Sequence, residues 1–275
     1  MKKPKTVLYI QTYNQEKYII DSLISAYNQD YENLTIYISD DASTDNTASL
    51  IEDFVRKNNT KHEVIVKVNN KNVGAVMNAK KSMEEISQFA NLVVIQDGDD
   101  ISIPKRASTL TELWVSLGEP EFLYIHTPVE IIDQENKFWI PPINQRPINL
   151  ANIATNPTSV GLTIGASSAY TPNMITHIPL LHTNLYIDQV LTFRSFFMKK
   201  LIYWGEPLLK YRFGTGMSNP NIDKEEYENK ITLSTIDTLK QRKFDAEFYG
   251  ISDIAEMISK ELDKWYKLAK TKNLL

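Results

Sequence analysis

The chain has 275 residues, 42% of them hydrophobic, which is enough to bury the core of one large α/β domain or of one domain with an appendage. Its net charge is −4 and it has no long basic run, so nucleic acid is not an expected partner. The lack of cysteine excludes disulfides and thiolate metal sites. Residues 7–10 are too short a run for a signal peptide, and no stretch could span a bilayer. We therefore expect a soluble, cytoplasmic protein with at most peripheral contact at the inner face of a membrane.

The first hundred residues alternate between short apolar runs and amphipathic segments. The apolar runs at 7–10, 34–39, 64–68 and 93–96 have the length of buried strands. The segments between them carry apolar residues at helical spacing, as Ile20, Leu23, Ile24 and Tyr27 do. This alternation predicts a mainly parallel sheet with helices on both faces.

Polar residues follow each predicted strand. In parallel sheets ligands bind outside the carboxyl ends of the strands, so these residues are expected to share one site. They are Thr12 and Tyr13, Asp40 and Asp41, Asn72 and Gly74, and Asp97 and Asp99.

The fourth strand runs into the acidic segment Asp97-Gly98-Asp99-Asp100. In an extended chain alternate residues share a side, so we expect Asp97 and Asp99 to face together and Asp100 to face away. Paired carboxylates suit Mg²⁺ or Mn²⁺, and Gly98 would let a ligand approach the backbone. The alternative is an acidic turn in which Asp100 or Ser102 caps the helix that opens near Pro104.

Four blocks in this order, residues 9–18, 39–47, 72–78 and 96–100, resemble family 2 glycosyltransferases of the GT-A fold. The resemblance implies a Rossmann-like α/β domain, a nucleotide-diphosphate sugar as donor, and inversion of the anomeric centre. It also assigns roles: Tyr13 stacks on the base, Asp41 with Asp40 beside it contacts the uracil edge, Asp97 lies near the ribose and Asp99 holds the metal. Family members differ over which carboxylate binds the ion, so Asp97 stays a candidate ligand and Asp100 stays open.

The chemistry of these residue types agrees with such roles. A divalent ion neutralises the charge that develops on a nucleoside diphosphate as it leaves. An aromatic face stacks on a base, although Tyr13 as a rim residue packed on its own helix is the alternative. A carboxylate at position 41 accepts from the uracil ring N–H, which favours uridine diphosphate.

The second half of the chain is predicted to supply the catalytic base. A helix at 104–116, a strand at 122–126, an irregular stretch to about 157 and an apolar strand at 160–170 precede a helix that begins near Ile187. Many relatives carry Glu-Asp at this point, and the Asp is the base. Here Ile187 replaces the first residue, while Asp188 occupies the position of the base. Removing the proton of the acceptor hydroxyl is the work of one general base, but Asp188 as a helix cap is the alternative.

Residues 208–218 resemble the closing strand and flexible loop of the family. Arg212 within them is expected either to pair with the diphosphate, since a guanidinium matches phosphate oxygens, or to bridge surface acids. The four histidines lack metal-ligand spacing.

The composition shifts after residue 222. We divide the chain into a catalytic domain at 1–222, with a nucleotide-binding half at 1–110 and a sugar and acceptor half at 111–222, and a tail at 223–275. The tail reads as two charged helices broken at Tyr249-Gly250, and the second has an apolar stripe that includes Ile254, Ile258 and Leu262. It is expected to pack on the catalytic domain, with a homo-oligomer contact or a membrane-surface contact as alternatives.

The resemblance, together with these patterns, implies a metal-dependent, inverting transferase that moves one sugar from a UDP-sugar to a hydroxyl of a surface polysaccharide or glycoprotein glycan. The chain lacks the Gln-x-x-Arg-Trp block of processive relatives, so one sugar is expected per encounter. A receiver-type signalling domain would be less than half as long. A catalytically silent nucleotide-sugar-binding subunit is the stronger alternative, because Ile187 breaks the base motif.

Overall fold

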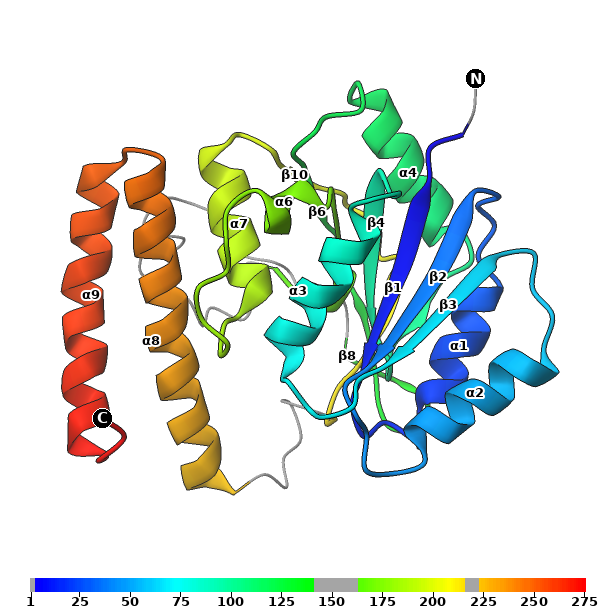
Figure 1. Ribbon diagram of the computed structural model, residues 1–275, viewed down its shortest axis with the longest axis horizontal. Coiled ribbons are helices and arrows are strands. Elements are labelled where there is room, and N and C mark those ends of the chain that lie inside the picture. Colours follow the sequence, from blue (N-terminus) through cyan, green and yellow to red (C-terminus); the bar gives the residue numbers. More distant parts are fainter. Residues whose placement is uncertain (1–2, 141–162, 216–222) are drawn as a thin grey trace.

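The computed structural model describes residues 3–140, 163–215 and 223–275. A mainly parallel seven-stranded sheet is flanked by helices on both faces, as predicted (Figure 1). Its strand order is β10-β6-β9-β4-β1-β2-β3. The strands are β1 (Thr6–Thr12), β2 (Leu34–Asp40), β3 (Glu63–Val68), β4 (Leu92–Asp97), β6 (Tyr124–His126), β9 (Ser168–Tyr170) and β10 (Leu201–Tyr203). Only β9 among them runs antiparallel to its neighbours, β4 and β6.

Alternate residues of the central strands face opposite layers of helices. Leu8 and Ile10 belong to the core beneath α1 (Ile19–Tyr27), α2 (Thr47–Lys57) and α4 (Arg106–Ser116). Val7 and Tyr9 belong to the core beneath α3 (Ala75–Ile86), α6 (Asn173–Thr176) and α7 (Ile187–Phe197). Burial on both faces explains why these strands read as continuous apolar runs.

A second, four-stranded sheet stands beside the carboxyl ends of the main one. Its order is β5-β11-β7-β8, formed by β5 (Ile101–Ser102), β11 (Leu209–Arg212), β7 (Glu130–Ile132) and β8 (Phe138–Ile140). The helix predicted at 104–116 begins at Arg106, because residues 101–102 join this sheet first. Most of the predicted irregular stretch, with Pro141-Pro142, lies outside the described residues, as do residues 160–162 of the predicted strand and residues 216–218 of the predicted loop.

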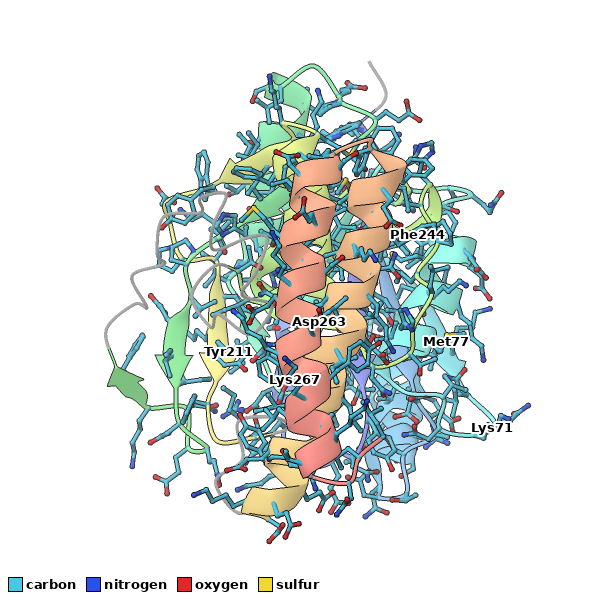
Figure 2. All side chains as sticks on the ribbon, turned by 90° about the vertical axis from the view of Figure 1, so that its left-hand side faces the viewer. Lys71, Met77, Tyr211, Phe244, Asp263 and Lys267 are labelled. Atoms are coloured by element: carbon cyan, nitrogen blue, oxygen red, sulfur yellow. The ribbon has the colours of Figure 1, made fainter. Side chains whose placement is uncertain are left out.

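The tail forms two long antiparallel helices, α8 (Lys224–Phe248) and α9 (Ser252–Thr271), which lie beyond α7 (Figures 1 and 2). Asp223 caps α8 by accepting a hydrogen bond from the backbone N–H of Glu226. The predicted break is confirmed at Gly250, whose φ of +70° is left-handed and favours glycine. The apolar stripe of α9 packs with α8 and with Phe193 of α7. No helix in the described ranges has the length and apolar character needed to cross a membrane.

Candidate functional site

The parallel register brings the predicted polar strand ends to one edge of the sheet. β1 lies between β2 and β4, so that Thr12 pairs with Asp40 and Gln11 pairs with Asp97. Tyr13 follows β1 and exposes 44% of its surface at this edge. The carboxyl ends of β1, β2 and β4 thus form one continuous rim, which Asn72 and Gly74 extend just before α3.

The two aspartates after β2 organise the neighbouring loops. Asp40 is buried, and its carboxylate accepts hydrogen bonds from the backbone N–H and the hydroxyl of Ser43. Asp41 accepts from the Asn69 amide at 2.8 Å and from the backbone N–H groups of Val73 at 2.9 Å and Gly74 at 2.8 Å.

Asp41 therefore fastens the loop that contains Asn72 and Gly74 to the end of β2. Gly74 has a φ of +85°, a left-handed conformation that L side chains rarely adopt. Asn72 accepts a second hydrogen bond from the Gly74 N–H.

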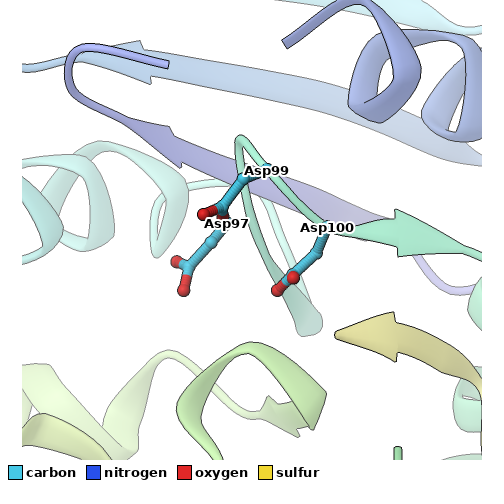
Figure 3. A group of neighbouring side chains, drawn as sticks. All are labelled: Asp97, Asp99 and Asp100. Atoms are coloured by element: carbon cyan, nitrogen blue, oxygen red, sulfur yellow. The ribbon is translucent and has the colours of Figure 1, made fainter. Parts of the chain in front are cut away.

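Asp97, Asp99 and Asp100 form one acidic cluster (Figure 3). Each offers a carboxylate oxygen, and these oxygens all lie within 4.8 Å of one another. The prediction that Asp100 faces away is wrong. Strand alternation stops at Asp97, where β4 ends, and the chain turns so that the Asp100 N–H donates to the Asp97 carbonyl at 3.1 Å.

Gly98 is required by the protein itself. Its N–H donates to the Gln11 carbonyl at 2.9 Å and extends the pairing of β1 with β4. A Cβ at this position would meet the side chain of Gln15 and lie 2.8 Å from Cβ of Thr12. The expectation that Gly98 leaves room for a ligand is therefore corrected, because neighbouring side chains occupy that space.

The cluster is electrostatically unfavourable without a counterion. Removal from water, together with the charges of Asp99 and Asp188, raises the pKa of Asp97 to about 7. Burial also raises the pKa of Asp99, and burial with both neighbouring carboxylates raises that of Asp100 well above its ordinary value. A divalent cation would relieve this repulsion, and carboxylate oxygens are the ligands that Mg²⁺ and Mn²⁺ prefer.

Arg212 holds the acidic turn from within the protein. Its backbone N–H donates to the Asp100 carboxylate at 2.9 Å, and Nε donates to the Asp99 carbonyl at 2.8 Å. The guanidinium lies 4.5 Å from the ring centroid of Tyr18, and the side chain is completely buried. Arg212 reaches one partly exposed acid, Asp21, at 3.6 Å. Arg212 is thus fixed by the acidic turn on one side and by the ring of Tyr18 on the other.

Arg106 is a second buried cation that the sequence analysis missed. Its guanidinium donates to the carbonyls of Ile95 and Ala166, both at 2.6 Å, and to the Ser102 hydroxyl at 2.9 Å. Burial lowers the pKa of Arg106 to about 9, against the effect of Asp100 and Asp97. A cation in the first turn of a helix opposes the helix dipole, and this is the signal that could have identified it.

Asp188 lies across from the acidic cluster, in the first turn of α7. It is half-buried, and burial raises its pKa. The Gln189 amide donates to its carboxylate at 2.9 Å, and the charge of Asp188 acts on Asp97. The helix-cap alternative does not hold, since Tyr186 is the N-cap of α7 and no side-chain cap hydrogen bond forms at the start of this described helix. Ile187, which replaces the Glu of many relatives, packs against the apolar core.

The chain resembles known proteins in both sequence and fold. Residues 8–175, more than half of the chain, match glycosyl transferase family 2. EpsE of Bacillus subtilis (strain 168), named as a glycosyltransferase, is 30% identical over 103 residues. The match covers 38% of this chain and 36% of EpsE, so this chain aligns with only about a third of the length of that relative.

Two solved structures share the arrangement of elements. S. aureus TarS 1–349, in complex with UDP-GlcNAc, superposes with a TM-score of 0.60 at 18% identity, covering 89% of this chain and 71% of that one. The mannosyltransferase PcManGT from Pyrobaculum calidifontis, in complex with GDP-Man and Mn²⁺, also gives 0.60, at 15% identity, and covers 98% and 76%. These likenesses show the GT-A fold. The match over residues 8–175 establishes that the chain belongs to glycosyl transferase family 2.

Proposed function

We propose that this protein is an inverting, metal-dependent glycosyltransferase that moves one sugar from a UDP-sugar to a hydroxyl of a surface polysaccharide or glycoprotein glycan. The observation that carries the proposal is the acidic cluster at the end of β4, placed so that Asp188 on α7 acts on it electrostatically. Membership of glycosyl transferase family 2 supports the reaction class. A cytoplasmic location, a homo-oligomer contact through the tail and the domain boundary at residue 222 stay predictions.

The donor set of the acidic cluster fits Mn²⁺ or Mg²⁺. Asp99 and Asp97 are the proposed ligands, and Asp100, turned toward them, is a third candidate. A bound divalent ion would neutralise the charge that develops on the departing diphosphate. Arg106 and Arg212 hold the backbone that carries these carboxylates, so the ligands are positioned before any ion enters. The Mn²⁺ in the PcManGT complex supports this choice of metal.

The rim of β1 and β2 is the proposed nucleotide site. Asp41 accepts three hydrogen bonds within the protein, and an ionised carboxylate has about four acceptor positions, which leaves one for the uracil N–H. Tyr13 offers an exposed ring for base stacking, and Thr12, Asp40, Asn72 and Gly74 shape the same rim. The UDP-GlcNAc of the TarS complex supports uridine, whereas the GDP-Man of PcManGT makes guanosine the alternative to test.

Asp188 is the proposed general base. It would accept the proton of the acceptor hydroxyl while that oxygen attacks the anomeric carbon and the nucleoside diphosphate leaves from the opposite face. A pKa raised by burial suits this role, because a base works best when its pKa approaches the operating pH. One base on the acceptor side is what inversion requires.

The test combines donor binding with turnover. Calorimetry with Mn²⁺ should show tighter binding of uridine diphosphate than of guanosine or cytidine diphosphate. Uridine diphosphate release is then measured with UDP-glucose, UDP-galactose, UDP-N-acetylglucosamine and UDP-N-acetylgalactosamine. Asp99→Asn should lose metal-assisted binding and turnover. Asp188→Asn should lose about 10²–10⁴-fold in turnover and keep nucleotide affinity and melting temperature.

Asp263→Asn is the matched control, since the same change is made at an exposed position on the outward face of α9 (Figure 2). Equal affinities for the three diphosphates would contradict the uridine assignment. Normal turnover of Asp188→Asn would exclude Asp188 as the general base. If no preparation turns over any donor while uridine diphosphate still binds, the catalytically silent binding subunit becomes the better reading, as the Ile187 replacement suggests.

A further inference from the structure

Helix α8 of the tail is hydrogen-bonded to the segment that carries Asp188. Three consecutive contacts join them, although more than fifty residues separate the partners in sequence. The Thr238 hydroxyl accepts from the Tyr186 N–H at 3.0 Å, the Gln241 amide oxygen accepts from the Leu181 N–H at 2.7 Å, and the Arg242 guanidinium donates to the Gln189 carbonyl at 2.8 Å.

A buried ion pair fixes α8 against α7 one turn further along. Arg194 and Asp245 are both fully buried, and Nε of Arg194 lies 2.7 Å from the carboxylate. Arg194 also donates to the carbonyls of Met174 and Ile178 at 3.0 Å. The position of α8 relative to the amino end of α7 is therefore determined by directional contacts as well as by apolar packing.

Arg242 is the residue of α8 that acts on Asp188. It is completely buried, and its guanidinium lies 5.7 Å from the ring centroid of Phe193. It holds the backbone of Gln189, whose side chain donates to the Asp188 carboxylate at 2.9 Å. Its charge also favours the ionised form of Asp188, and Asp188 in turn opposes the desolvation that lowers the pKa of Arg242 to about 9.

We propose that Arg242 is a positioning residue for the transfer reaction: it holds the amino end of α7 and supplies the buried positive charge that faces the carboxylate of Asp188. The inference rests on the proposed function, in which Asp188 is the base. It makes residues 223–275 a working part of the catalytic unit and not an appendage.

Other groups also act on Asp188 and shape the test. Asp97 from β4 interacts repulsively with it, and the phenols of Tyr124 from β6 and Tyr186 before α7 lie within its electrostatic reach. Measurements are therefore made at saturating Mn²⁺, so that the state of Asp97 is the same in every variant.

The first experiment is the pH profile of uridine diphosphate release from the UDP-sugar that wild type hydrolyses fastest. In Arg242→Met the acidic limb of the pH profile should move to higher pH by about one unit, because the pKa of Asp188 rises when the neighbouring positive charge is removed. One unit is the lower end of the range by which an opposite charge shifts the pKa of a carboxyl group. Turnover below that limb should fall about tenfold, and KM for the donor should change less than twofold. Arg242→Lys, which keeps the charge, should return the limb to the wild-type position.

Lys243→Met is the matched control, because it removes a neighbouring but partly exposed charge from the same helix. Its profile should match wild type. A wild-type limb and wild-type turnover in folded Arg242→Met would overturn the inference. If Arg242→Met does not fold, Arg242→Gln replaces it, since an amide can still donate to the Gln189 carbonyl while the charge is removed.

A second experiment does not depend on turnover. Urea unfolding of Arg242→Met, Asp188→Asn and the double variant at pH 8 measures the coupling between the two side chains. Non-additivity is expected, and additivity would overturn the electrostatic interaction between Arg242 and Asp188. Coupling together with normal turnover of Asp188→Asn would reject the proposed base but keep this interaction. Collapse of turnover in Asp188→Asn without coupling or limb shift would keep the base and reject the role of Arg242.

Discussion

Mn²⁺ should stabilise this protein much more at pH 8 than at pH 6. The pKa of Asp97 is raised from 3.8 to about 7, so the folded state binds more protons than the unfolded state between these values. The free energy of unfolding of the metal-free protein should therefore fall as the pH rises from about 4 to about 7. Metal binding reverses this trend, because a carboxylate must be ionised before it can act as a ligand.

The size of the effect follows from the pKa. A carboxyl of pKa about 7 is about 90% ionised at pH 8 and about 10% ionised at pH 6, so the apparent Mn²⁺ affinity should differ about tenfold, or by about 1.4 kcal/mol. With excess Mn²⁺ this difference appears in the stability in full. For a chain of this size it corresponds to about 3–6 °C in melting temperature.

The assay is the melting temperature with and without Mn²⁺ at both pH values. Asp97→Asn should show a smaller Mn²⁺ shift that differs less between the two pH values than in wild type, because only Asp99 and Asp100 remain to titrate. Without metal it should melt above wild type at pH 8, because an uncompensated charge is gone. Asp263→Asn should behave as wild type. An equal Mn²⁺ shift in wild type at pH 6 and pH 8 would refute the reasoning, and so would a pH dependence in Asp97→Asn as large as that of wild type.

Three further outcomes are expected. Gly98→Ala should lower the melting temperature and weaken uridine diphosphate binding at least tenfold, because the new methyl group would lie 2.8 Å from the Thr12 Cβ. Gly205→Ala is the control, because a Cβ there would have nothing within 4 Å and should change neither quantity. Equal effects of the two substitutions would contradict the close packing around Gly98. Asp245→Ala should cost about 3–5 kcal/mol in urea unfolding, since it leaves a buried cation unpaired, and replacing Arg194 by Met in the same chain should recover much of the loss. Asp41→Ala should weaken uridine diphosphate binding more than tenfold in calorimetry, because three hydrogen bonds to the neighbouring loop are lost. Unchanged affinity would mean that the uracil binds elsewhere.

Local sequence patterns determined the elements of the nucleotide-binding half. The apolar runs and the helical spacing between them depend on near neighbours along the chain, so β1, β2, β3 and β4 and the helices among them were predictable. The placement of polar residues at one rim followed from parallel pairing, which brings Thr12, Asp40 and Asp97 to the same edge. The break in the tail was predictable because glycine favours the left-handed turn at residue 250.

Contacts between distant residues decided what the local pattern could not. Asp100 turns toward Asp97 because the chain leaves β4 to join β5, and its carboxylate meets the Arg212 backbone 112 residues away. Burying Arg106 depends on the carbonyl of Ala166, 60 residues away, and placing Arg242 behind Asp188 depends on α8 packing on α7. A buried cation becomes favourable only when acceptors from other elements surround it, and no short window of sequence contains them. The candidate metal ligands, the proposed base and Arg212 were thus predicted from the sequence, whereas the inward contacts of Arg212 and the positions of Arg106 and Arg242 became apparent only in the tertiary structure.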